Sequence, residues 1–398
     1  MFIINNNFII IYLYTNLNLM EENLPLPLPD RRITNPKEYL IRSTDYNSEY
    51  NNISTKDFQN SISKYIDLQE SKQSTMSVAQ IKQIEDMRQK ILSYKLLSDK
   101  TIYINDFQSN QKINKCNLIL FGPSGSGKSS FIKSLYRALY NSPILPPETN
   151  NKLIIRKKNL NEGTLLFSQF HLVKENENNS GIMICDTRGH IKMNNNEKEQ
   201  FKVLLNGQIK DMVSLEQRVN RDPKALWEFW KKSSELFPKE IFKEKEGEGN
   251  IKSIPHSVVF IFDGNSDEII QSEDIKFYQD LVEISRDKGY KDINVILTRV
   301  DECENNVRKR NNNLPETEIH SKINTMKDIK IEKVINILGV NRSNVHFIEN
   351  YHLENQMTNS ITIDYNILKT LIDIINISEL FILDEINRKQ ACCYGYCK

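Results

Sequence analysis

The stretch Gly122-Pro-Ser-Gly-Ser-Gly-Lys-Ser129 determines the fold that this sequence predicts. It follows the apolar run Cys116–Phe121, which we expect to be a buried strand, and leads into 130–140, where the apolar residues have helical spacing. A strand, a glycine-rich turn and a helix in this order are the setting of a phosphate-binding loop. In such a loop, backbone N–H groups converge on phosphate oxygens at the positive end of the helix.

The side chains of this loop have distinct predicted roles. Lys128 is expected to reach the β- and γ-phosphates and to take part in catalysis, and the Ser129 hydroxyl is expected to bind Mg²⁺. The alternative is an ordinary glycine turn between a strand and a helix. We favour a nucleoside triphosphate ligand, with further contacts expected from Gly122, Ser124, Gly125, Ser126, Gly127 and Ser130.

The bulk properties restrict the other partners. A formal net charge of +1 over 398 residues gives no reason to expect nucleic acid. The six cysteines lack metal-ligand spacing, which suits a reducing, cytoplasmic location. Near the C-terminus, Cys392 and Cys393 leave a palmitoylated membrane contact open, against an unmodified frayed tail.

Three parts are expected along the chain. Residues 1–75 are polar, and we predict a flexible arm there. Residues 76–388 are predicted to form the nucleotide domain, with a leading helix and an inserted helical and loop segment at about 191–255. Residues 389–398 form a tail that contains cysteines.

Short apolar runs separated by helical or loop segments predict the architecture of the nucleotide domain. This alternation is typical of an α/β fold with a mostly parallel sheet and helices on both faces, here a P-loop NTPase of the G-domain type. We expect strands at 164–170 (at the sheet edge), 181–185, 257–262, 293–298 and 344–348, and a closing helix at about 368–386.

In an open parallel sheet, ligands bind beyond the carboxyl ends of the strands. The motif Asp186-Thr-Arg-Gly189 follows one predicted strand. There Asp186 can hold Mg²⁺ through water, and the Gly189 N–H can meet the γ-phosphate. Such a motif is a common turn in isolation, and its place after an apolar strand favours the functional interpretation. Thr149 is the expected threonine that closes on Mg²⁺, on its spacing after Lys128 alone.

The next motif, Thr298-Arg-Val-Asp301, is expected to read the base. A carboxylate at Asp301 accepts hydrogen bonds from the N1–H and exocyclic amine of guanine, whereas adenine presents an acceptor there. Arg299 stands where Lys is usual, and its apolar stem can cover the base. Asn350, beyond the last strand, lies in a loop that is expected to contact the guanine oxygen. The alternative for Asp301 is an exposed carboxylate that caps the next helix.

The sequence also bears on hydrolysis. His190 either orients the attacking water or is a loop histidine without a catalytic part, and both interpretations stay open. No arginine is marked as a finger within the chain, so we expect slow turnover. Arg188 acting across a homodimer formed through the nucleotide face is a further alternative, against an ordinary surface role.

Over about 77–388 the sequence resembles the interferon-induced protein 44 group of GTP-binding proteins. The resemblance implies a cytoplasmic protein that binds GTP or GDP with Mg²⁺ and is linked to defence or stress responses. Arg299, the long insert at 191–255 and the lack of an N-terminal TLDc domain depart from the group's pattern. The segments that carry the resemblance to this group are 118–131, 185–189, 205–209, 256–263, 297–301, 338–340 and 349–352.

Three functions are therefore weighed. A GTP-binding switch with slow hydrolysis is favoured. A non-catalytic module that binds GTP to order a surface is the second, and it would keep its properties when His190 is replaced. An ATP-using P-loop enzyme is the third, and it would leave Asp301 without a role.

Overall fold

The structure is a computed structural model that describes residues 78–98, 113–142, 144–155, 166–187, 189, 195–207, 209–214, 250–351 and 360–393. Contacts divide the chain into two units, 1–82 with 353–359, and 83–352 with 360–398. The second unit holds the predicted nucleotide domain and is the one considered below. The predicted N-terminal arm and most of the 191–255 insert lie outside the described residues.

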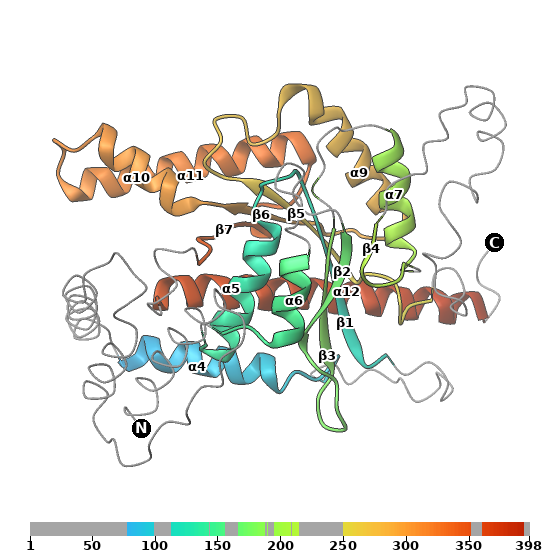
Figure 1. Ribbon diagram of the computed structural model, residues 1–398. Coiled ribbons are helices and arrows are strands. Elements are labelled where there is room, and N and C mark those ends of the chain that lie inside the picture. Colours follow the sequence, from blue (N-terminus) through green and yellow to red (C-terminus); the bar gives the residue numbers. More distant parts are fainter. Residues whose placement is uncertain are drawn as a thin grey trace, which may run out of the picture. The chain divides into compact units, whose positions relative to one another are not determined.

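Within the described residues a seven-stranded sheet has the order β4-β2-β3-β1-β5-β6-β7 (Figure 1). β1 is parallel to β3 and β5, and β5, β6 and β7 continue the parallel part. β2 is antiparallel to β3, and β4 is antiparallel to β2. The strands are β1 (Lys115–Phe121), β2 (Leu166–Val173), β3 (Gly181–Asp186), β4 (Val213–Ser214), β5 (Ser257–Asp263), β6 (Asn294–Thr298) and β7 (Val345–Phe347).

Helices cover both faces of this sheet. One face packs against α5, the first half of α12 and residues of α4, and the other packs against α7, α9, α11 and the second half of α12. The described helices are α4 (Val78–Leu92), α5 (Lys128–Tyr140), α6 (Pro147–Ile155), α7 (Asn195–Leu205), α9 (Ile275–Asp287), α10 (Val300–Arg310), α11 (Glu316–Leu338) and α12 (Ile361–Cys393).

The burial of strand β1 on both of its sides explains why its sequence is a nearly continuous apolar run. Successive side chains of a strand point to opposite faces of the sheet. Leu118 and Leu120 therefore share one core with Phe131 of α5. On the other face, the ring of Phe121 packs edge-on against Phe201 of α7, with ring centroids 4.8 Å apart. Because both faces of the sheet are buried here, the sequence of β1 lacks the alternation of apolar and polar residues that a half-exposed strand shows.

The predicted P-loop NTPase fold of the G-domain type is confirmed: the glycine-rich loop joins the central strand β1 to α5, and the strands around it are parallel. Two expectations need correction. β2 is not an edge strand, because β4, from the insert, pairs with its outer side. The closing helix is longer than 368–386: α12 continues to Cys393, so the first residues of the predicted tail are helical.

Among the described helices, none combines the length and the apolar composition required to cross a membrane.

Candidate nucleotide-binding site

The site lies at one edge of the sheet. Because β1, β3, β5, β6 and β7 are parallel, their carboxyl ends meet there. The glycine-rich loop follows β1, and four of the other strands end at or beside polar residues. Asp186 is the last residue of β3, Asp263 of β5 and Thr298 of β6, and Asn350 lies beyond β7.

The loop delivers the N-terminus of α5 to this edge. Gly127 precedes the helix in a left-handed conformation (φ +97°) and, as a glycine, has no side chain to cap the first turn. A Cβ at Gly127 would lie 3.0 Å from Thr298 Cγ2 and 3.2 Å from Asn350 Nδ2, so glycine lets the helix start against both residues. The N–H groups of a first helical turn carry partial positive charge and suit an anion.

Lys128 lies inside the loop rather than on its surface. Its side chain is buried, and Nζ donates to the carbonyl oxygens of Gly122 and Pro123, each at 2.8 Å. The ammonium is thereby fixed at the helix N-terminus, beside the backbone N–H groups. A phosphate bound there would meet a full positive charge and a helix dipole together.

Ser129 and Asp186 form the candidate metal pair. The Ser129 hydroxyl donates to Asp186 Oδ2 at 2.8 Å, and Asp186 is fully buried at the end of β3. Mg²⁺ takes oxygen ligands, and in phosphate sites a protein usually supplies one or two of them while phosphate oxygens and water complete the octahedron. A hydroxyl and a carboxylate at this distance fit that donor set.

Gly189 lies directly against the glycine-rich loop. A Cβ at this position would come within 2.7 Å of Ser124 Cα, so any other residue would displace the loop or the turn. The Thr187 hydroxyl donates to the Leu120 carbonyl at 2.8 Å and so ties this turn to strand β1. The Asp186–Gly189 turn and the loop are thus one packed unit. The predicted catalytic residue His190, and Arg188, lie outside the described residues.

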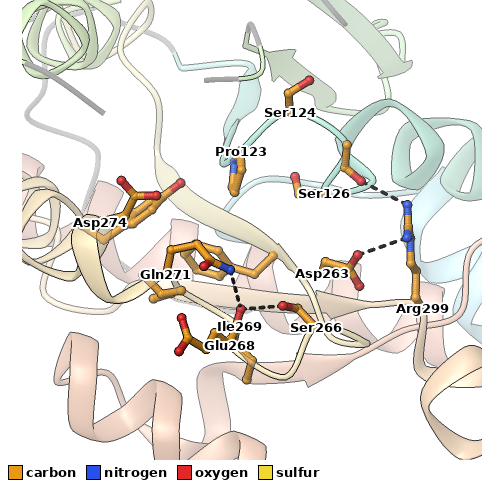
Figure 2. A pocket seen from close by; sticks show the side chains of 14 residues that line it. Pro123, Ser124, Ser126, Asp263, Ser266, Glu268, Ile269, Gln271, Asp274 and Arg299 are labelled. Carbon is orange, nitrogen blue, oxygen red and sulfur yellow. Dashed lines mark hydrogen bonds and ion pairs between the residues drawn. The ribbon is translucent and has the colours of Figure 1, made fainter. Parts of the chain in front are cut away.

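The end of β6 is tied to the same loop. The fully buried Thr298 hydroxyl donates to the Ser126 carbonyl at 2.8 Å. Arg299 has a left-handed backbone (φ +58°), and its guanidinium lies 3.1 Å from Asp263 Oδ2. It also reaches the Gly125 carbonyl at 3.5 Å, and Figure 2 shows it between the loop and Asp263. The planar fork of Arg allows both contacts at once.

Asp301 and Asn350 flank this region. Asp301 lies in the first turn of α10, two residues beyond Arg299. Asn350 Oδ1 is buried and has no hydrogen-bond partner among the described residues, and the same holds for Ser126 Oγ. A buried polar atom without a partner calls for a ligand or water to complete it.

One predicted site residue is not brought to this edge. Thr149 lies in α6, is buried, and lies near the Tyr136 hydroxyl, which donates to the His171 carbonyl at 2.7 Å. Tyr136 lies two turns beyond Lys128, roughly 12 Å along α5 at 1.5 Å per residue. Thr149 was predicted from its spacing after Lys128 alone. Pro147 begins a helix here, as proline often does at the first helical position, and this helix carries Thr149.

Sequence reasoning also missed Asp263. This residue ends β5 and holds the guanidinium of Arg299. The signal was present, because the rule that located Asp186 at the end of β3 applies equally to an aspartate at the end of β5, the parallel strand on the other side of β1.

No family model and no curated protein matches the chain. Among solved structures it is similar to a dimerization-deficient mutant of Toc33 from Arabidopsis thaliana, with 11% identity, 77% of this chain and 94% of that chain covered, and a TM-score of 0.38. It is also similar to the putative nucleolar GTP-binding protein 1 from Plasmodium falciparum, with 14% identity, coverage of 72% and 97%, and a TM-score of 0.30. The fold is assigned from the strand order and the loop described above.

Proposed function

We propose that this protein binds guanine nucleotides at the edge of the sheet and acts as a switch between its GTP and GDP forms. The observation that carries the proposal is a chain of contacts. The loop 122–129 is joined to the Asp186–Gly189 turn on one side and to Thr298 and Arg299 on the other. Elements suited to phosphate, metal and base thus form one connected site.

The phosphate end of the proposal rests on charge and on backbone geometry. The N-terminus of α5 and the buried ammonium of Lys128 supply positive charge. Mg²⁺, when bound, would neutralise phosphate charge, and Ser129 and Asp186 are the residues that would hold it.

The part of the site that would hold the base favours guanine over adenine. The Thr298 contact to the Ser126 carbonyl fixes how far the start of α10 lies from the phosphate loop. Asp301 in that first turn would accept two hydrogen bonds from guanine. Adenine offers an acceptor at the same edge and would be repelled, which argues against the ATP-using alternative.

The switch itself is assigned to Gly189. This residue touches the loop where a third phosphate would arrive, so its N–H and the turn that carries it would respond to that phosphate. Slow hydrolysis aided by Lys128 and His190, a cytoplasmic location and the resemblance to the interferon-induced protein 44 group belong to the same proposal.

The direct test is a calorimetric titration of the full chain with GTP, GDP and ATP in Mg²⁺, followed by a phosphate-release assay with GTP. We expect both guanine nucleotides to bind and ATP to bind at least about 100-fold more weakly, the equivalent of about 2.7 kcal/mol. Phosphate release should be slow and should need GTP. Equal affinities for ATP and GTP would contradict guanine recognition, and tight binding without phosphate release would favour the non-catalytic module.

A further inference from the structure

The residue before α10 has a backbone conformation that needs support. Arg299 is the N-cap of α10, with φ +58° and ψ +37°, and its side chain makes no capping hydrogen bond to the helix. Residues other than glycine rarely adopt this left-handed conformation, because the Cβ comes close to the following carbonyl oxygen. Contacts elsewhere in the structure must hold such a residue in place. Since Asp301 lies two residues further on, whatever holds Arg299 also sets where that carboxylate lies.

Three acceptors surround the guanidinium of Arg299. Nη1 lies 3.1 Å from Asp263 Oδ2, Nη2 lies 3.5 Å from the Gly125 carbonyl oxygen, and Nε lies 4.0 Å from Glu302 Oε1. Only the first of these distances lies within the usual range of an N–H···O hydrogen bond. Figure 2 shows Asp263 and the glycine-rich loop on either side of the guanidinium. Asp263 is therefore the principal partner of Arg299 among the described residues.

The carboxylate of Asp263 has a fixed position relative to the start of α10. Asp263 is the last residue of β5 and is paired in register with Thr298 of β6. Its Oδ1 accepts a hydrogen bond from the Asn265 N–H at 2.9 Å, which leaves Oδ2 for Arg299. The Gly264 N–H donates to the Thr298 carbonyl at 2.9 Å, and a Cβ at Gly264 would lie 2.6 Å from that oxygen. The ends of β5 and β6 are thus held together directly before Arg299.

The stability of the fold does not account for this ion pair. The side chains of Arg299 and Asp263 are 45% and 32% exposed. Ion pairs this accessible to water contribute little to folding, because water and salt screen them and both side chains lose freedom. A base covered by the apolar stem of Arg299 would shield the pair from water and strengthen it. The pair therefore has more to contribute to a bound nucleotide than to the folded chain alone.

The pair also accounts for arginine where lysine is usual. A lysine ammonium is a single charge on a flexible stem, whereas the guanidinium offers several donors in fixed directions. The fork of Arg299 can face the Asp263 carboxylate and the Gly125 carbonyl at once. Arginine at 299 and aspartate at the end of β5 thus belong to one arrangement.

We propose that Asp263 is a positioning residue for guanine recognition. Its carboxylate holds the guanidinium of Arg299, and Arg299 in turn holds the left-handed turn from which α10 begins with Asp301. Asp263 acts through these two residues and has no contact of its own with the base. The inference rests on the proposed function, because it concerns how the guanine-reading carboxylate is placed.

Titration of the full chain with GDP and with inosine diphosphate in Mg²⁺ tests the proposal. Inosine diphosphate lacks the exocyclic amine of guanine and keeps the N1–H, so the ratio of the two affinities measures the contact of Asp301 with that amine. We expect the unaltered chain to prefer GDP about tenfold or more, the equivalent of about 1.4 kcal/mol. Asp263→Asn keeps an oxygen for the Asn265 N–H but loses the charge that holds Arg299. It should reduce the preference at least about threefold, whereas Asp263→Glu, which keeps the charge, should retain most of it.

A second variant approaches the same pair from its other end. Arg299→Gln removes the guanidinium and should reduce the preference for GDP at least as much as Asp263→Asn does. Adding Asp263→Asn to Arg299→Gln should change nothing further, because Asp263 acts through Arg299. Asp267→Asn is the matched control, because Asp267 is an exposed acidic residue of the same loop, and it should keep the full preference.

Three results would overturn the proposal. They are an unchanged preference in Asp263→Asn, equal losses of GDP and inosine diphosphate in that variant, and an undiminished effect of Asp263→Asn in the Arg299→Gln chain. An unaltered chain without a preference for GDP would overturn the proposed function and this inference with it. An unaltered chain that prefers GDP, with a variant that keeps the preference, contradicts only the role of Asp263.

Discussion

At the scale of single residues, Gly189 is the clearest case of a position in the candidate site where only glycine fits. The constraint that the structure shows is space: a Cβ would lie 2.7 Å from Ser124 Cα. Real Cβ atoms do not approach backbone so closely. Glycine is therefore required for the turn after β3 to rest against the phosphate loop.

Gly189→Ala should separate the two nucleotide states. The added methyl group must push the turn away from Ser124, and the N–H proposed to meet the third phosphate moves with it. We expect GTP affinity to fall about tenfold or more, the worth of one charged hydrogen bond, while GDP affinity changes less than about threefold. Gly181→Ala, at the other end of β3, is the control and should leave both affinities unchanged in the same titrations. A variant that loses GTP and GDP equally would contradict the switch role of this turn.

Residues also show how far the sequence predicted which side chains reach the edge of the sheet that carries the candidate site. Asp186 was predictable at this edge because it ends an apolar strand, and strand ends define the edge of a parallel sheet. Thr149 was not, because its assignment used only a spacing from Lys128 and no local pattern. The helix α6 then placed it beside Tyr136 instead.

At the scale of elements, a buried cluster fixes the loop beyond β7 that carries Asn350. The Tyr351 N–H donates to Ser134 Oγ of α5 at 2.9 Å, and its hydroxyl donates to Asp364 Oδ1 of α12 at 2.7 Å. The guanidinium of Arg137 lies over the Tyr351 ring, 3.9 Å from its centroid. Helices α5 and α12 therefore hold this loop from two sides.

Tyr351→Phe should weaken both the fold and the site. It removes the donor to the buried Asp364 carboxylate, which we expect to cost about 1–3 kcal/mol in the free energy of unfolding. GDP affinity should fall as well, because the loop carrying Asn350 loses an anchor. Urea unfolding and GDP titration measure the two effects.

The control for this change is Tyr140→Phe. Tyr140 lies at the end of α5, is 46% exposed and donates its hydroxyl to the Leu172 carbonyl. Its loss should cost less stability and leave GDP affinity unchanged. If both variants behave alike, Tyr351 does not connect α12 to the nucleotide site.

At the scale of the whole molecule, a buried histidine joins β1 to the segment before β5. His256 Nδ1 accepts a hydrogen bond from the Asn117 N–H at 3.0 Å, and Nε2 lies 2.7 Å from the Ile251 carbonyl, to which it donates. The ring is thus held neutral with its proton on Nε2. Burial lowers the pKa of His256 to about 4.

This group makes global stability depend on pH. Between pH 6.5 and about 4 the unfolded chain binds a proton at His256 that the folded chain does not, so stability is lost as pH falls through this range. The loss amounts to about 3 kcal/mol at about 1.36 kcal/mol per pKa unit. Denaturant unfolding at pH 7 and pH 4.5 should show a smaller pH dependence in His256→Gln than in the unaltered chain. His320→Gln, on the exposed surface of α11, should keep the full dependence, and identical behaviour of all three proteins would contradict the assignment.

The architecture as a whole was largely predictable, and its exceptions have physical causes. The parallel strands read as apolar runs because both faces of the sheet are covered, as in β1 and β5. β4 was missed because two residues, Val213 and Ser214, carry no periodic signal.

The central claim is that Asp301 reads guanine while the loop 122–129 holds the phosphates, and one measurement tests it most directly. Asp301→Asn should be titrated with GDP and with xanthosine diphosphate, whose base has a carbonyl where guanine has its amine. The carboxylate of Asp301 only accepts, whereas an asparagine amide can donate to that carbonyl.

We expect the unaltered chain to prefer GDP by about 100-fold and the variant to prefer xanthosine diphosphate, since each charged hydrogen bond contributes about 1.5–3 kcal/mol. Glu302→Gln, at the exposed neighbouring position in α10, should keep the preference for GDP. A preference that Asp301→Asn leaves unchanged would contradict base recognition at Asp301 and with it the guanine-nucleotide account of this protein.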